Sequence, residues 1–383
     1  MIKIKTYLQD HAAEILADIK KLVLAESPSH DKAAVDRCGD VLQAIFLQRL
    51  GISAEIEPQQ QYGNFLRFTL GERGPQTTIL GHFDTVWDKG ELPLREEDGR
   101  LYGPGILDMK AGLVQAIWAV HALKALNRLG EQRIVFLCNS DEELGSPGSR
   151  RWIETHAEGS AQVLVMEPAV VGSGALKVAR KGTGRYSIAI TGLAAHAGNN
   201  PEEGVSAVQE MAHQIIALHS LNAPERGTTV NVGIAQGGSR INVVADRAQL
   251  GIDTRVTTPE EAARIHQAIS ALSPRLSGIM LSVSGEQMRP PMTQTAASRQ
   301  LLARAQQTAT TLGLHVEGKA VGGGSDGNFT SAMGLATLDG LGATGVGIHA
   351  RNEHIIIADV PVRAALVAGV IAGECAVQDK EAP

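Results

Sequence analysis

Hydrophobic and polar positions follow helical and strand periods in turn along the first half of the chain. Apolar residues recur at helical spacing over residues 5–26 and 31–50, and β-rich runs follow at ISAEIEP, NFLRFTL and QTTILG. Helical spacing returns from Lys110 to Leu129. The chain then continues with the apolar strand RIVFLCNS, a helix near 148–157 and the strand QVLVME. This alternation predicts an α/β domain in which a sheet lies between layers of helices.

The order of elements changes after about residue 183. It becomes a strand at GRYSIAITG, a helix over 203–219, strands at TTVNVGIAQGG and RAQLGIDTRV, a helix over 259–272 and a strand at GIMLSVSGE. This βαββαβ order is that of a ferredoxin-like unit. The earlier alternation resumes after residue 290 and ends in a helix at about 360–375. We therefore expect one domain from residues 1–180 and 289–383, with residues 181–288 inserted into it.

Composition limits the classes of protein to which the chain can belong. Its 383 residues, 43% hydrophobic and 20% charged, fit a globular protein of two domains. A net charge of -6 with scattered Lys and Arg argues against a nucleic-acid partner. The first 30 residues lack the pattern of a signal peptide, and we expect no membrane-spanning segment. Cys38, Cys138 and Cys375 show no CxxC spacing, which favours reduced thiols and a cytoplasmic location.

The first candidate for chemistry is the pair His82 and Asp84, at the end of the apolar strand in QTTILGHFDTVW. A spacing of two residues turns both side chains to the same side of a strand. A metal-bound imidazole usually donates its other N–H to a carboxylate, so Asp84 would orient His82. The alternative is a strand-end histidine beside an aspartate that forms a turn.

Further acidic residues and a second histidine follow in four blocks. Asp108 lies in the Gly-rich turn of LYGPGILDMKAG, where capping of the next helix is its alternative role. The three acidic residues 141–143 follow an apolar strand, and such crowding is costly unless a cation neutralises it. Glu167 ends another apolar strand, and His349 follows a Gly-rich one.

These blocks lie mostly at strand ends or in the turns that follow, where open α/β sheets bind ligands. We therefore expect their side chains to converge. Two imidazoles and three carboxylates suit Zn²⁺ with an open position for water.

With these blocks in this order, the sequence resembles a family of zinc peptidases that includes carboxypeptidase G, acetylornithine deacetylase, succinyl-diaminopimelate desuccinylase and aminoacylase. The matching motifs occur in the family's order over nearly the whole chain: GHFDTVW, DGRLYGPGILDMKAG, NSDEELGSPGS, MEP, HAG, INVV with DTR, GGGSDGNF and GIHARNE. The GPG, HAG and GGGSD segments favour the carboxypeptidase G branch. The resemblance implies a mixed-sheet catalytic domain carrying a ferredoxin-like lid and dimerisation domain.

The resemblance also implies two Zn²⁺ per subunit, for which Co²⁺ or Mn²⁺ are possible substitutes. Asp108 would bridge both metals. Glu143 and His349 would complete one site, and His82 and Glu167 the other.

The catalytic roles that the resemblance implies fall on three more residues. Glu142 corresponds to the general base that activates water, and Asp84 to the carboxylate that orients a ligand. His196 resembles a histidine that reaches into the active site of a partner subunit, which implies a homodimer; its alternative is a loop histidine without a role. The peptide bond between Asp108 and Met109 is expected to be cis.

Substrate binding is implied at the lid and at a Gly-rich loop. Arg255 resembles the arginine that clamps the substrate's carboxylate, and an ion pair at the rim is its alternative role. The remaining expected contacts are Asn242, Gly323, Gly324 and Ser325.

The function that follows is hydrolysis of the amide bond of an N-acyl amino acid or small peptide, releasing a C-terminal amino acid, with glutamate as the first expectation. A deacylase or dipeptidase of the same superfamily, with another specificity, is the alternative. A catalytically silent binding protein is a third possibility, against which the presence of Glu142 and all five ligands argues.

Overall fold

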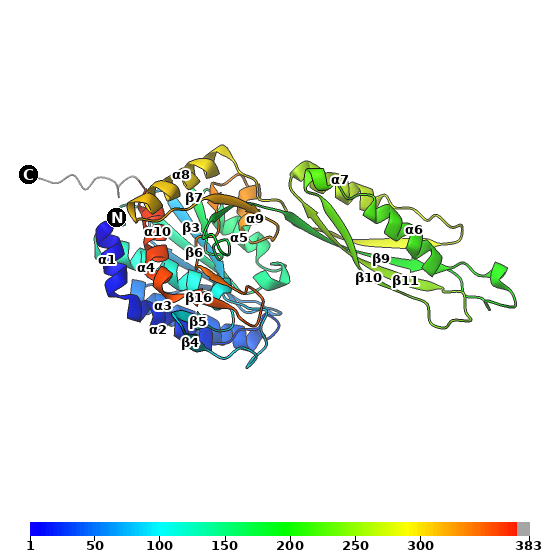
Figure 1. Ribbon diagram of the computed structural model, residues 1–383, viewed down its shortest axis with the longest axis horizontal. Coiled ribbons are helices and arrows are strands. Elements are labelled where there is room, and N and C mark those ends of the chain that lie inside the picture. The colour runs from blue at the N-terminus through cyan, green and yellow to red at the C-terminus, as the bar shows by residue number, and fades with distance from the viewer. Residues whose placement is uncertain (374–383) are drawn as a thin grey trace, which may run out of the picture. The chain divides into compact units, whose positions relative to one another are not determined.

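The computed structural model describes residues 1–373, so Cys375 and the predicted end of the last helix lie outside the described residues. The chain divides into two compact units (Figure 1). The first consists of Met1–Ala179, Gln294–Val321 and the described chain from Ser325 onward. The second consists of Arg180–Thr293 together with Gly322–Gly324.

A six-stranded sheet, in the order β1-β2-β6-β3-β7-β14, forms the middle layer of the first unit. Its strands are β1 (Glu55–Glu57), β2 (Phe65–Leu70), β3 (Gln76–His82), β6 (Arg133–Asn139), β7 (Gln162–Val165) and β14 (Thr337–Leu338). β6, β3, β7 and β14 run parallel, whereas β1 and β2 are antiparallel to their neighbours. The predicted mixed sheet is confirmed.

The strands contribute to two hydrophobic cores because successive side chains point to opposite faces of the sheet. Ile79 and Phe136 pack in the larger core, whereas their neighbours Leu80 and Leu137 pack in a smaller core on the other face. Helices that contribute to the larger core are α1 (Ile2–Asp10), α2 (Ala12–Leu24), α3 (Lys32–Leu50), α4 (Ala111–Ala125), α8 (Ala296–Thr311) and α10 (Val360–Ala372). The smaller core includes α5 (Arg150–Ala157) and α9 (Gly327–Ala332).

The first predicted helix is wrong in one respect, because it is two helices that join at His11. The His11 ring stacks on Tyr7 with centroids 4.2 Å apart, and its Nδ1 lies 2.7 Å from the Tyr7 carbonyl oxygen. The Tyr7 carbonyl oxygen, an acceptor within α1, is thus contacted by the His11 ring. His11 is also the residue at which the backbone departs from helical angles. α4 also ends before the predicted Leu129, since Asn127 adopts left-handed backbone angles with a φ of 54°.

Among residues 1–373, only the helical segment Ile106–Ala125 is long and apolar enough to cross a membrane by length and composition. Of its most apolar window, 94% is buried inside the protein, as is typical of a helix in a protein core.

A second, four-stranded sheet in the first unit has the order β15-β16-β5-β4. Its strands are β4 (Arg95–Glu97), β5 (Arg100–Tyr102), β15 (Gly345–Val346) and β16 (His354–Ile356). His354 pairs with Tyr102. This register brings the turn that follows β5 beside the loop that precedes β16. A further pair joins β8 (Leu176–Arg180) to β13 (Gly318–Val321).

The second unit is an antiparallel sheet in the order β10-β11-β9-β12, with two helices over one face (Figure 1). Its elements in chain order are β9 (Gly182–Thr191), α6 (Ala207–His219), β10 (Thr229–Gly237), β11 (Arg247–Val256), α7 (Pro259–Ser270) and β12 (Met280–Arg289). α6 begins after the predicted residue 203 because the Ser206 hydroxyl caps it by accepting from the Gln209 N–H. The predicted ferredoxin-like βαββαβ unit is confirmed.

Candidate metal centre and active site

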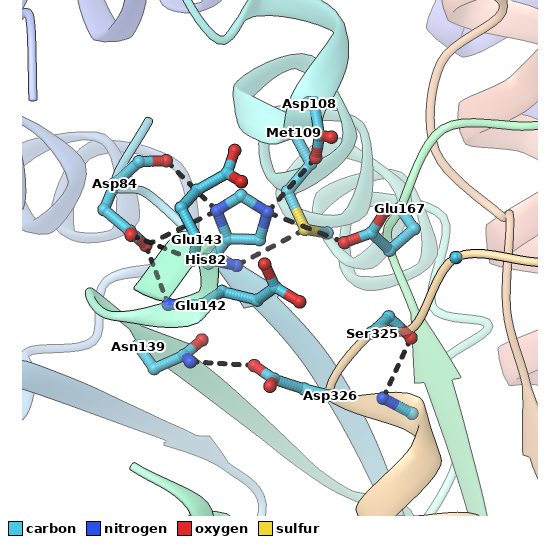
Figure 2. A network of polar contacts seen from close by, with 12 residues as sticks. His82, Asp84, Asp108, Met109, Asn139, Glu142, Glu143, Glu167, Ser325 and Asp326 are labelled. Atoms are coloured by element: carbon cyan, nitrogen blue, oxygen red, sulfur yellow. Dashed lines mark hydrogen bonds and ion pairs between the residues drawn. The ribbon is translucent and has the colours of Figure 1, made fainter. Parts of the chain in front are cut away.

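Three parallel strands bring the predicted ligands of the first unit to one edge of the sheet. His82 is the last residue of β3, Glu142 and Glu143 form a short turn after β6, and Glu167 follows β7. Because β3 pairs in parallel with both β6 and β7, the carboxyl ends of these strands meet at the same edge. Residues far apart in the sequence therefore converge, as the strand-end pattern predicts (Figure 2).

Asp108 lies between the two predicted histidine ligands. Its Oδ1 is 3.2 Å from His82 Nε2, and its Oδ2 is 3.5 Å from His349 Nε2. Glu167 Oε1 lies 3.5 Å from His82 Nε2, and Glu143 Oε1 lies 3.1 Å from His349 Nε2. Each side of the Asp108 carboxylate thus faces one histidine and one glutamate. The peptide bond between Asp108 and Met109 is cis, as expected.

Asp84 orients His82 from the side opposite Asp108. His82 Nδ1 lies 3.1 Å from the Asp84 carbonyl oxygen and 3.5 Å from its Oδ1. The Asp84 carboxylate also accepts hydrogen bonds from the backbone N–H groups of Glu142 and Glu143, both at 3.3 Å. A proton on Nδ1 therefore leaves the Nε2 lone pair of His82 to face Asp108 and Glu167. Asp84 is fully buried, and it holds the imidazole chiefly through its backbone carbonyl and the acidic turn through its carboxylate.

The electrostatics of the cluster favour positive charge. Hydrogen bonds with Asp108 and Glu143 raise the pKa of His349 to about 11. Burial opposes a charge on His82, yet its contacts with Asp108, Asp84 and Glu167 hold its pKa well above the ordinary value. Burial also raises the pKa of Glu143 to about 7, although His349 opposes that change. A divalent cation meets the same demand for positive charge among these acceptors.

The donor set fits a metal ion. One ligand atom each from His82, Asp108 and Glu143 lie within 4.8 Å of one another, and the same holds for His82, Glu142 and Glu167. Imidazole nitrogens and carboxylate oxygens without cysteine are donors that zinc and similar divalent ions accept. Glu142 reaches the cluster from the same turn as Glu143, so its carboxylate lies beside His82 and Glu167.

The acidic turn after β6 is anchored by buried polar residues that the sequence did not single out. Asn139 Nδ2 donates to Asp326 Oδ2 at 2.7 Å (Figure 2). Asn139 Nδ2 also lies 2.9 Å from Ser149 Oγ, to which it donates, and the Ser146 hydroxyl donates to Asp326. Asp141 accepts from the backbone N–H of Gly148 at 2.7 Å. The GGGSD motif contains Asp326, so this motif contributes a support for the turn.

In the second unit, the structure brings two of the three predicted residues together. Val243 forms a β-bridge with His196, and the Ala197 N–H donates to the Asn242 carbonyl oxygen at 3.0 Å. His196 Nδ1 accepts from the backbone N–H groups of Gly198 and Asn199, at 3.1 and 3.0 Å. A neutral His196 therefore carries its proton on Nε2, where it is free of these contacts and able to donate.

Arg255 lies towards the other end of β11 and is not near His196 in this unit. Its guanidinium forms a bidentate ion pair with Asp253, with Nε 2.8 Å from Oδ1 and a terminal nitrogen 3.0 Å from Oδ2. At about 3.4 Å per residue, the stretch of β11 from Arg247 to Arg255 spans roughly 27 Å. The second unit alone therefore does not bring Arg255 together with His196 and Asn242.

The Gly-rich loop requires a correction at Ser325. This residue is fully buried, its backbone N–H donates to Asn328 Oδ1 at 2.9 Å, and its hydroxyl donates to Asp339 at 2.6 Å. Neither its N–H nor its hydroxyl is therefore available for the expected contact with substrate. The carbonyl oxygens of Gly323 and Gly324 both accept from Arg180 at 3.1 Å, which fixes the loop without using its N–H groups.

Two further supporting residues escaped the sequence reasoning. The Ser29 hydroxyl donates to Asp84 Oδ2 at 2.7 Å. The Glu353 carboxylate accepts from the Asp108 backbone N–H at 3.2 Å. Glu353 lies in the GIHARNE motif, which already marks this segment in the sequence. Ser29 lies in a loop segment that contains no such motif.

Comparison with known proteins identifies the family of this chain. The model of Peptidase family M20/M25/M40 matches residues 78–373. Carboxypeptidase G2 of Pseudomonas sp. (strain RS-16) is 28% identical over 380 residues, which cover 94% of this chain and 89% of that protein.

Solved structures share the fold. A tripeptidase from Staphylococcus aureus matches with a TM-score of 0.77 and 25% identity, covering 94% of this chain and 98% of the other. A dinuclear metal binding peptidase of the M20 family from Bacillus subtilis matches with a TM-score of 0.68 and 16% identity, covering 95% and 98%. The resemblance that the motifs indicated is confirmed, and this chain belongs to the M20/M25/M40 peptidase family, whose members are metal-dependent hydrolases.

Proposed function

We propose that the protein is a dizinc hydrolase that cleaves the amide bond of N-acyl amino acids or small peptides and releases a C-terminal amino acid, with glutamate as the first candidate. The observation that carries the proposal is the placement of Asp108, with one carboxylate oxygen towards each histidine. A carboxylate placed in this way is suited to bridging two metal ions.

The metal-binding residues divide into two sets that share Asp108. His82 and Glu167 would hold one ion, and Glu143 and His349 the other. When bound, the two ions polarise the scissile carbonyl and lower the pKa of a shared water. The chemistry of the donors suits zinc, and cobalt or manganese are possible substitutes.

Proton transfer is assigned to Glu142. Its backbone N–H is held by Asp84, and its carboxylate lies within the group of donors around His82 and Glu167. A carboxylate beside the ligands takes a proton from water and delivers it to the leaving amine.

Substrate recognition is assigned to the second unit and the Gly-rich loop. Arg255 already holds a carboxylate, that of Asp253, in the bidentate geometry that a substrate's terminal carboxylate would need. Asn242 would contact the substrate near the reacting carbonyl. Gly323 and Gly324 remain candidates for backbone contacts with the substrate.

A homodimer follows from the separation of these residues. His196 and Asn242 lie at one end of the second unit's sheet and Arg255 at the other, too far apart to touch one small substrate from a single subunit. A second copy would supply both Asn242 and His196, and the Nε2–H of His196 suits stabilisation of an oxyanion. The edge strand β10 supports this view, because an exposed edge with Ile234 56% exposed favours pairing with another chain.

The relatives bear on specificity. The name carboxypeptidase G2 supports release of a C-terminal residue, while the tripeptidase supports the alternative of a peptidase or deacylase with another specificity. We also propose a cytoplasmic location, because Cys38 and Cys138 are buried and unpaired, as thiols are in a reducing compartment.

A hydrolysis screen tests the proposed function. N-acyl amino acids, including N-acyl glutamates, and di- and tripeptides are incubated with the chelated protein before and after zinc is restored. We expect zinc-dependent release of the C-terminal amino acid, with the fastest turnover for glutamate. Faster cleavage of tripeptides at the N-terminal bond would favour the alternative, and zinc-independent cleavage would contradict the dizinc assignment.

A further inference from the structure

We infer that Glu353 is a positioning residue that fixes the backbone around Asp108 and thereby sets the affinity of the metal centre. The inference rests on the proposed function, in that it takes Asp108 to be a metal ligand. In this inference Glu353 contacts neither metal nor substrate.

The Glu353 carboxylate is enclosed by N–H donors. The side chain is 1% exposed. Its Oε1 accepts from the backbone N–H groups of Leu107 and Asp108, at 2.9 and 3.2 Å. Its Oε2 accepts from Trp87 Nε1 at 2.6 Å and from the Gly105 N–H at 3.3 Å. Four donors occupy the lone pairs of both oxygens, so Glu353 supports the centre and does not act as a ligand.

The fold explains why this residue reaches that turn. Glu353 immediately precedes β16, whose first residue His354 pairs with Tyr102 at the end of β5. The chain leaves β5 directly into the turn that carries Asp108. Trp87, which follows the His82 strand, closes the same carboxylate from the other side.

The turn depends on this carboxylate because three of its backbone N–H groups donate to it. Gly105 adopts a left-handed backbone with a φ of 65°, and a Cβ there would lie 2.1 Å from the Thr85 side chain. Without the Glu353 oxygens, three backbone N–H groups and one indole N–H would be buried without an acceptor. The direction of the Asp108 carboxylate would then be less well defined, which weakens metal binding more than it weakens the fold.

Glu353→Gln tests the inference, because it keeps the size of the side chain but replaces one acceptor oxygen with a donor. The matched control is Glu210→Gln in the second unit. Glu210 is also fully buried and accepts from the backbone N–H groups of Arg275 and Leu276, at 3.0 and 2.9 Å, and from Gln214 Nε2 at 2.6 Å. Zinc affinity of the full chain is measured by competition with a chromogenic chelator, and folding of the metal-free protein by circular dichroism.

We expect Glu353→Gln to weaken zinc binding roughly 10- to 100-fold, the range for residues that orient ligands, while Glu210→Gln changes it by less than about 2-fold. Hydrogen exchange at the Leu107 and Asp108 amides should accelerate in Glu353→Gln. If Glu353→Gln does not fold, Trp87→Phe, which removes one donor, should weaken zinc binding to a smaller extent.

Three results separate the possible failures. If the wild-type chain binds no zinc, both the proposed function and this inference are wrong. Only the inference is wrong if the following results occur together. The wild type binds zinc, Asp108→Asn abolishes binding, and Glu353→Gln and Trp87→Phe both bind zinc as the wild type does. Equal losses in Glu353→Gln and Glu210→Gln would also overturn it, since the effect would then be general destabilisation.

Discussion

Ser29 donates its hydroxyl to Asp84, with Oγ 2.7 Å from Oδ2, and both residues are buried. Asp84 in turn contacts His82 and the N–H groups of Glu142 and Glu143. A serine in the loop after α2 is therefore linked through Asp84 to the proposed metal ligand His82 and to the proposed general base.

The first prediction concerns this link. Asp84→Asn should weaken zinc binding roughly 10- to 100-fold, because the orientation of His82 is lost. Ser29→Ala should have a smaller effect in the same direction, since it removes only one of the hydrogen bonds that hold the Asp84 carboxylate. Competition with a chelator measures both. The control is Ser27→Ala, because the buried Ser27 hydroxyl donates to a backbone carbonyl, that of Phe83, at 2.6 Å. Equal losses of affinity in the two serine variants would contradict the link.

The second prediction separates proton transfer from ligation. Glu142→Gln should lower kcat roughly 10² to 10⁴-fold and leave zinc content at the wild-type value, because the residue is assigned proton transfer. Glu143→Gln, its neighbour, should lose zinc. Metal analysis beside steady-state kinetics distinguishes the two. The assignment fails if zinc content and turnover fall together in Glu142→Gln.

The third prediction uses the ion pair between Arg255 and Asp253. Arg255→Ala should raise KM and lower kcat for substrates with a free carboxylate, because both affinity and orientation are lost. For substrates with an amidated carboxylate, Arg255→Ala should change KM and kcat little. Asp253→Asn should lower KM, since it frees the guanidinium from a competing carboxylate. If Arg255→Ala still discriminates acid from amide as the wild type does, the Gly323 and Gly324 loop is the better candidate for the clamp.

The fourth prediction concerns sharing of the site between subunits. Glu142→Ala and His196→Ala variants should each be inactive alone, and mixing them under conditions of subunit exchange should restore about a quarter of the wild-type activity. Half of the randomly formed dimers contain one of each variant, and such a dimer has one intact site. Absence of recovery in a mixture shown by mass spectrometry to contain hybrid dimers would refute the shared site.

The fifth prediction is a pH dependence of the second unit. Hydrogen bonds from Arg264 and Thr228, and a further one from Arg226, lower the pKa of Glu261 from 4.5 to about 2. A lowered pKa stabilises the folded state above the unfolded value of 4.5, and this stabilisation is lost as the pH falls towards 2. Glu261→Gln should therefore unfold more readily in urea than the wild type at pH 7, with a smaller difference at pH 3. An equal difference at both pH values would be inconsistent with this pKa.

Much of the architecture was predictable because it depends on periodic burial. The strand that ends at His82 and the βαββαβ order both follow from patterns that repeat along the chain. The break at His11 was not predictable, because it depends on one ring contacting one carbonyl, and apolar spacing continues across it.

The convergence of the candidate ligands was predictable from residue type at strand ends, and so was Asp84 beside His82, but the support from Glu353 and Ser29 was not. Glu353 contacts Asp108 only because β16 pairs with β5, and no local pattern contains that pairing. Ser325 was predicted to bind substrate from its position in a Gly-rich motif. Its burial and its partners Asn328 and Asp339 become visible only in three dimensions.

The interrupted course of the first unit has a consequence for synthesis on the ribosome, where the N-terminal part of a chain emerges first. Until β14 (Thr337–Leu338) is made, β7 lacks the neighbour that covers its outer edge. At that stage Asp108, Glu143 and Glu167 have been translated, but His349 has not. The nascent chain therefore contains the carboxylates of the proposed centre before it contains His349. A metal ion that bound at that stage would have only one of the two imidazoles available. On the proposed set of ligands, hydrolytic activity therefore requires that translation has passed His349.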